Sequence, residues 1–319
     1  MFETPRFPKT LAAAALVLTA QAQALVPVTP ANIVGTGLMV ANCASLHGSG
    51  NGMTISEAID SGLFADGTAC NGQALQGAVG SVNSSASRVN ANAAATAQGQ
   101  VSMGVMHLGS QLDTTGGNAA LFPVAISQGG FGDTLTVNLA GKQGQAGVLQ
   151  VAVHVSGVLD ASGNAGSSAF KVDVTKNDQL MFKDGGIAQT VAWKAASYPV
   201  PGPLSEHVVV NETVLFSIPI TFGTSFELVV LGQSIAATRS QTGGGHSASD
   251  FMQTLWWEGV QGVKVGNQQV QGYTLTSASG IDWAVAAVVP EPSTWLMLVA
   301  GLGLLGGLRR TSARPQADR

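Results

Sequence analysis

Alternation of apolar and polar residues is the feature that most restricts the fold of this chain. Leu135, Val137 and Leu139 are separated by polar residues, and the longest alternating run places an apolar side chain at nearly every second position from Val214 to Phe222. Successive side chains of a strand point to opposite faces of a sheet, so a period of two predicts strands with one buried face. Such runs recur at 135–139, 151–155, 170–174, 214–222 and 226–230.

Segments rich in Gly, Asn and Asp separate these runs and predict turns, at 160–164, 184–186, 243–245 and 266–267. Several short strands punctuated in this way favour an all-β fold, an antiparallel β-sandwich with polar outer faces. Pro219 lies inside the longest run and has no N–H to donate, which predicts that this strand bends, bulges or lies at a sheet edge. The 41 glycines and the low charged fraction of 10% are typical of a secreted β-rich protein.

The N-terminus has the pattern of a secretory signal peptide. Basic residues at Arg6 and Lys9 precede an apolar run at 11–20, and the small residues Ala22 and Ala24 follow. The apolar run is too short to span a bilayer core of roughly 30 Å. We expect signal peptidase to cut after Ala24, which makes residues 1–24 a cleaved leader.

Cys43 and Cys70 are the only cysteines, and an exported pair of this kind predicts a disulfide. Two free thiols are the alternative. Between them, Thr54 and Glu57 form a capping box, and apolar residues at 55–63 have helical spacing. This predicts a short helix in a disulfide-closed segment, which serves either as a recognition loop or, in the interpretation that we favour, as a structural cap.

Residues 77–100 are rich in Ser, Ala, Asn and Gly. They fit a flexible linker, or a strand built of small alternating residues. We prefer a loop that passes into a strand near Ala97. The expected organisation is therefore a disulfide-linked N-terminal segment with a short helix and this linker at 25–95, then a β-sandwich domain at 96–288.

The last part of the chain, 289–319, has three ordered features. Pro290, Glu291 and Pro292 come first, an apolar stretch at 296–308 follows, and Arg309 and Arg310 close it. The prolines predict an extended segment, and the arginine pair predicts that this end stays on the cytoplasmic side of a membrane. A single short hydrophobic helix is expected between them.

In this order and position, the three features resemble the PEP-CTERM sorting signal. The resemblance implies an exported protein of a Gram-negative bacterium that makes extracellular polysaccharide. It also implies that the inner membrane holds the tail transiently until an exosortase cuts near Pro290–Pro292. A plain C-terminal membrane anchor is the alternative. The segments 131–138 and 250–280 also look like parts of β-sandwich domains that PEP-CTERM proteins carry.

Known catalytic motifs are missing from the sequence, with no G-x-S-x-G elbow and no Walker loop. The five histidines have no partner at metal-ligand spacing, and Gly243–His246 fits a simple loop. We therefore assign no catalytic residue, no cofactor and no metal. The turn at 160–164 could donate oxygens to Ca²⁺, although it is also an ordinary turn.

Trp256 and Trp257 are candidate contacts for a glycan because flat aromatic rings stack on sugars. Neighbours on a strand point to opposite faces, so one of the two is expected in the core. The mature part, 25–289, has 8 basic and 15 acidic residues and a net charge of −7, which disfavours nucleic acid as a partner.

These observations predict an exported, non-enzymatic protein of the cell surface or extracellular matrix. Its expected partners are signal peptidase and exosortase during export, and extracellular polysaccharide in a biofilm afterwards. One alternative is a carbohydrate-binding module that uses exposed aromatic residues. A secreted hydrolase whose site is assembled from distant acids is the least favoured alternative.

Overall fold

The computed structural model describes residues 28, 30–33, 35–46, 69–77, 80–115, 123–163, 166–183, 191–196, 205–238 and 244–287. Within this part of the chain the protein is an antiparallel β-sandwich of two sheets, as predicted, with one 3₁₀ turn, η1 (Pro30–Asn32). The expected leader at 1–24, helix at 55–63 and tail at 289–319 lie outside the described residues. No helix among the described residues is long and apolar enough to cross a bilayer.

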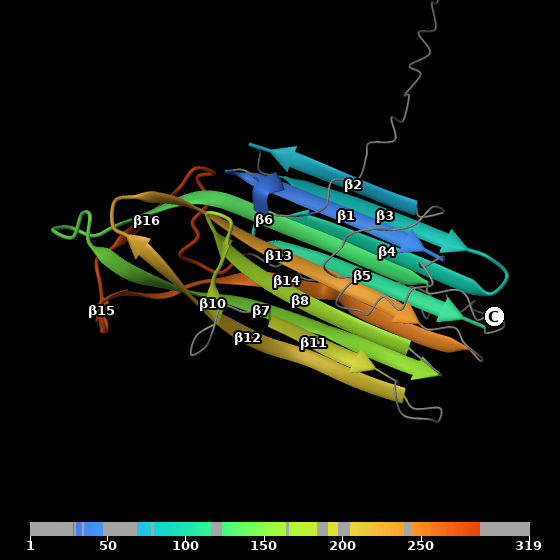
Figure 1. Cartoon of the computed structure of the whole chain (residues 1–319). Coiled ribbons are helices and arrows are strands. Elements are labelled where there is room, and N and C mark those ends of the chain that lie inside the picture. The colour runs from blue at the N-terminus through green and yellow to red at the C-terminus, as the bar shows by residue number, and fades with distance from the viewer. Residues whose placement is uncertain are drawn as a thin grey trace, which may run out of the picture.

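The two sheets, A and B, lie face to face (Figure 1). Sheet A contains, in spatial order, β11 (Val191–Ala196), β8 (Gly166–Lys176), β13 (Ser225–Thr238), β6 (Val124–Asn138), β1 (Gly37–Ser45) and β2 (Ala69–Gln76), with β16 (Thr274–Ser277) beside β6 and β9 (Gln179–Leu180) beside β8. Sheet B contains β10 (Phe182–Lys183), β12 (Ser205–Thr221), β7 (Ala146–Gly163), β14 (Gly245–Val265), β5 (Val105–Thr114), β4 (Ala93–Ser102) and β3 (Ser81–Val89), with β15 (Gln268–Val270) beside β14.

Large side chains fill one part of the space between the sheets. The alternating residues of β12 are buried there, and Phe216 and Ile218 are fully enclosed. Phe170 of sheet A stacks on Phe251 of sheet B with ring centroids 3.7 Å apart. The predicted period of two is therefore confirmed as the pattern that packs this core.

Small side chains fill the other part, and serines connect the two sheets directly. Ser110 Oγ of sheet B donates to the carbonyl of Ser234 in sheet A at 2.9 Å, and Ser234 Oγ donates back to the carbonyl of Ser249 at 2.8 Å. Ser127 Oγ of sheet A donates to the carbonyl of Gln98 in sheet B at 2.7 Å. A side chain as short as Ser reaches the opposite backbone only where the sheets approach closely, so these buried hydroxyls are satisfied.

This close approach corrects our preferred interpretation of 77–95 as a loop. Residues 81–89 form β3, and β4 begins at Ala93 and pairs with it along its length. Ala95 and Ala97 are buried, and a Cβ added at Gly99 would lie 2.7 Å from Val40 of sheet A. Large apolar residues would not fit there, so the strand has the small, weakly hydrophobic composition that resembles a linker.

Three other segments test the sequence interpretation. The disulfide between Cys43 and Cys70 is confirmed, and it joins directly opposite residues of the neighbouring strands β1 and β2. β12 lies at the edge of sheet B except where the two-residue β10 pairs with it. This agrees with the edge position that the proline at 219 indicates. The predicted loop around His246 is wrong, because β14 begins at Gly245 and His246 pairs with β5 and β7.

Candidate functional site

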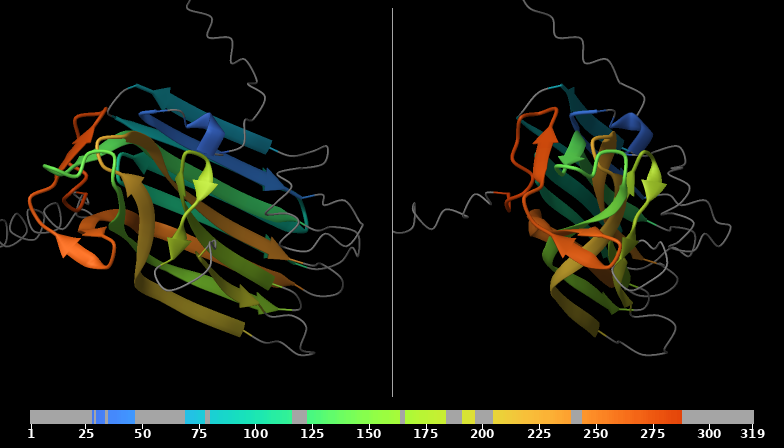
Figure 2. Two further views of the ribbon diagram at one scale, coloured as in Figure 1. Left: turned by 60° about the vertical axis from the view of Figure 1, so that its left-hand side comes forward. Right: turned by 90° about the vertical axis from the view of Figure 1, so that its left-hand side faces the viewer.

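The segment 271–287, which we call the C-terminal strap, is the last part of the chain that the structure describes. It includes β16, which pairs with the end of β6 from Thr274 opposite Asn138 to Ser277 opposite Leu135. Figure 2 shows this orange to red segment at one end of the sandwich. The segment 131–138 and the end of 250–280, both singled out in the sequence, therefore lie side by side.

Asp133 on β6 holds the strap to the sandwich. Its carboxylate is fully buried. Oδ1 accepts hydrogen bonds from Thr36 Oγ1 at 2.9 Å, from Thr134 N at 2.8 Å and from Ser279 N at 3.2 Å. Oδ2 accepts from Trp283 Nε1 at 2.7 Å and from Ser279 Oγ. Donors from three separate segments thus converge on a single carboxylate, which satisfies its buried charge.

Trp283 is the apolar anchor of the strap. Its side chain is 3% exposed and packs 5.8 Å from the Phe131 ring and edge-on to the Trp257 ring at 5.3 Å. The Trp257 indole also donates to the carbonyl of Trp283 at 2.9 Å. Each buried indole N–H therefore has an acceptor, as a buried Trp requires.

Two glycines allow the end of the strap to lie directly on sheet B. Gly259 has φ +89°, and a Cβ there would lie 2.7 Å from the carbonyl oxygen of Ala284. A Cβ on Gly104 would lie 2.7 Å from the Cβ of Ala287. Ala287 N donates to the carbonyl of Trp257 at 2.8 Å. The backbone is therefore fixed to the core as far as the last described residue.

The histidines of the described residues lie on the strands of sheet B. His207 Nδ1 lies 2.6 Å from Asp160 Oδ1, and His246 Nδ1 lies 2.6 Å from an oxygen of Asp113. No group of three or more His, Cys, Asp or Glu in this part of the chain is arranged to hold a metal ion. These pairs could not be predicted from the sequence, because the partners are 47 and 133 residues apart.

The adjacent tryptophans differ in burial, as strand geometry predicts. Trp257 is 1% exposed and belongs to the core, so it is removed from the candidate glycan contacts. Trp256 is half-buried, and its ring stacks on His154 with centroids 3.9 Å apart. His154 is held in turn by Asn211 Oδ1 at 2.9 Å and Thr213 Oγ1 at 3.0 Å. Only Trp256 of the pair remains available to a ligand.

The residues expected to take part in processing lie outside the described part of the chain: Ala22, Ala24, Pro290–Pro292, Arg309 and Arg310. Comparison with known families does place one of these segments, because residues 288–310 match the PEP-CTERM protein-sorting motif. No curated protein sequence matches the chain. The matched segment begins at the residue after Ala287, which is the last residue that the structure describes.

Proposed function

From the premise that this chain carries the PEP-CTERM sorting motif, and is therefore an exported protein sorted by an exosortase, we propose what it does after export. It is a non-enzymatic component of the cell surface or extracellular matrix of a Gram-negative bacterium and associates there with the extracellular polysaccharide of a biofilm. Signal peptidase removes residues 1–24. The tail holds the precursor in the inner membrane until it is cut near Pro290–Pro292.

The observation that carries this proposal is the position of the motif relative to the strap. The backbone is hydrogen-bonded to sheet B as far as Ala287, and the motif begins at residue 288. A cut near Pro292 lies after the strap in the chain, so it leaves in place the hydrogen bonds described for Asp133, Trp283 and Ala287. Such a body can fold while it is still tethered, and it stays folded when the tether is removed.

The hydrogen bonding of the buried Asp133 carboxylate supports the non-enzymatic part of the proposal. Asp133 accepts five hydrogen bonds. Its lone pairs are therefore occupied by structural donors, so it is a poor candidate for the acid or base that a hydrolase needs. The His207–Asp160 and His246–Asp113 pairs lie on exposed strand surfaces, whereas an enzyme active site is usually enclosed in a cleft.

A carbohydrate-binding module that uses surface aromatics is the second candidate. Trp256 supports it, because its indole is half-buried on the outer side of sheet B. His154 stacks on one face of that ring, so a sugar would have to contact the part of the indole that remains exposed. In a glycan array, loss of all retention on Trp256→Ala would favour this candidate, whereas unchanged retention would exclude Trp256 as the contact.

The test of the proposed function is the mass of the secreted protein. The chain is expressed in a bacterium that has an exosortase and in the same strain with that gene deleted. We expect a product that starts at Leu25 and ends near Pro292 in the first strain, and the complete tail in the second. Replacing Pro290, Glu291 and Pro292 by Ala should likewise leave the tail uncut. The control Val285→Ala, an exposed substitution in the strap, should be cut like the parent. An identical full-length tail in both strains would overturn the proposal.

A further inference from the structure

A polar groove of about 330 Å³ lies where strand β2 of sheet A meets strands β3 and β4 of sheet B. Its lining is dominated by five carboxamide side chains, with Met252 of β14 as the apolar member. The carboxamides are those of Asn71, Gln73, Asn83, Gln98 and Gln100. Among the described residues, no charged side chain lines this groove, although the expected mature chain has a net charge of −7.

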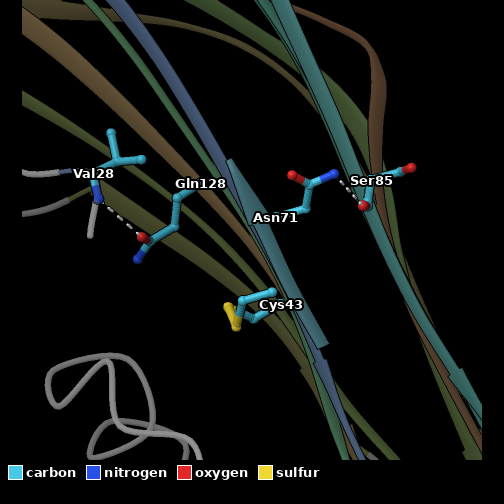
Figure 3. Close-up of a disulfide and its surroundings, with 6 residues drawn as sticks. Val28, Cys43, Asn71, Ser85 and Gln128 are labelled. Atoms are coloured by element: carbon cyan, nitrogen blue, oxygen red, sulfur yellow. Dashed lines mark hydrogen bonds between the residues drawn. A yellow bond between two sulfur atoms is a disulfide. The ribbon is translucent and has the colours of Figure 1, made fainter. Parts of the chain in front are cut away.

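The rim of the groove is built from hydrogen bonds between the two edge strands. Asn71 Nδ2 donates to the carbonyl of Ser85 at 3.4 Å, and Gln73 Oε1 accepts from Asn83 N at 3.2 Å. Figure 3 shows Asn71 pointing from β2 toward Ser85. These bonds cover the free backbone groups of edge strand β3. Each of the two amides uses only one of its polar atoms in this way.

Other amides in the groove come from the exposed side of the β3–β4 pair. Gln98 lies opposite Ser85, and Gln100 lies opposite Asn83, in alternate cross-strand pairs that share one face of the sheet. All four of these residues are exposed. A carboxamide presents two N–H donors and an acceptor oxygen, so this surface offers donors and acceptors in a row along the strands.

The disulfide fixes the position of this rim. Cys70 precedes Asn71 on β2, and it is bonded to Cys43 in the opposite position of β1. In the part of the chain that the structure describes, β2 is the edge strand of sheet A and pairs through its backbone with β1. The cross-link therefore holds the strand that carries Asn71 and Gln73 against the rest of the sheet.

We propose that this groove binds a segment of a neutral polysaccharide. Sugar hydroxyls are paired donors and acceptors, which matches carboxamides better than it matches charged groups. The Met252 side chain offers an apolar contact for the C–H face of a sugar ring. A polyanion would find no cation among the described residues that line the groove and would be repelled by the net charge of the expected mature chain. The inference rests on the proposed association with extracellular polysaccharide and names the binding surface and the class of glycan.

The test uses the complete secreted chain on an array that contains neutral and acidic oligosaccharides. We expect retention of neutral glycans that is insensitive to salt between about 50 and 500 mM, because no ion pair is involved. The double variant Gln98→Ala/Gln100→Ala should weaken binding at least about tenfold, since it removes two sets of donors and acceptors. The matched control is Thr96→Ala, an exposed residue of the same strand that does not line the groove.

Melting curves show whether each variant is folded, so a loss of binding is not confused with a loss of structure. Failure to retain any neutral glycan, equal retention by the parent and the double variant, or salt-sensitive retention of acidic glycans would each overturn the inference. Normal export and tail removal together with any of these results would leave the sorting part of the proposed function intact. Loss of retention on Trp256→Ala alone would assign the glycan to the aromatic surface instead.

Discussion

Asp133→Asn is the substitution that tests most directly how the strap is held. Asn has nearly the same shape, and its oxygen can still accept from the donors that now contact Oδ1. Its amide nitrogen, however, replaces Oδ2, the acceptor of Trp283 Nε1 and Ser279 Oγ. If the amide is flipped, its nitrogen instead faces the three donors that now contact Oδ1, and these donors lose their acceptor. With the oxygen kept at the Oδ1 position, Trp283 Nε1 loses its acceptor outright, and the remaining hydrogen bonds no longer go to a charged group.

The expected loss follows from the strength of such bonds. Each hydrogen bond to a charged group contributes about 1.5–3 kcal/mol, and removal of the buried charge recovers part of the loss. We expect the free energy of unfolding to fall by about 3 kcal/mol. For a chain of this size the melting temperature should then fall by about 6–12 °C.

Thermal unfolding followed by tryptophan fluorescence is the suitable assay, because the strap carries Trp283 against Trp257. The matched control is Asp282→Asn, an exposed neighbour whose Oδ1 accepts from Ala284 N at 3.0 Å. Its melting temperature should change by less than about 2 °C. An equally small change for Asp133→Asn, with the same tryptophan emission as the parent, would refute the assigned role of Asp133.

Two further predictions concern covalent and steric constraints. Replacing Cys43 and Cys70 by Ser should lower the free energy of unfolding by about 3–4 kcal/mol, because the bridge closes a loop between residues 27 positions apart; an unchanged denaturant midpoint would contradict this. Gly259→Ala should lower the free energy of unfolding by roughly 3 kcal/mol, because the new Cβ combines a positive φ with a clash against Ala284. Gly141→Ala also has a positive φ but no neighbour within reach of the new Cβ, so it should lower the free energy of unfolding by about 1 kcal/mol. Equal melting temperatures for these two variants would show that the strap does not press on Gly259.

The sequence by itself determined the all-β class, the strands with large alternating side chains, the disulfide and the sorting motif. Each is a local property or, in the case of the disulfide, follows from having two cysteines in an exported chain. The period of two is visible wherever a strand packs against a wide part of the core, as in residues 214–222 of β12. The PEP-CTERM motif is likewise continuous in the chain, at 288–310.

Only the tertiary structure decided the features that depend on distance between the sheets or on long-range pairing. Several core-facing residues of β3 and β4, such as Ala86, Ala95 and Ala97, are small where sheet A lies close beneath them, and that proximity leaves no strong hydrophobic pattern in the sequence. Asp133 resembles any polar residue until the strap folds back across 146 positions to place Ser279 on it. Trp256 and Trp257 could be assigned to opposite faces from strand geometry alone, but the side of the sheet that faces the core had to come from the packing.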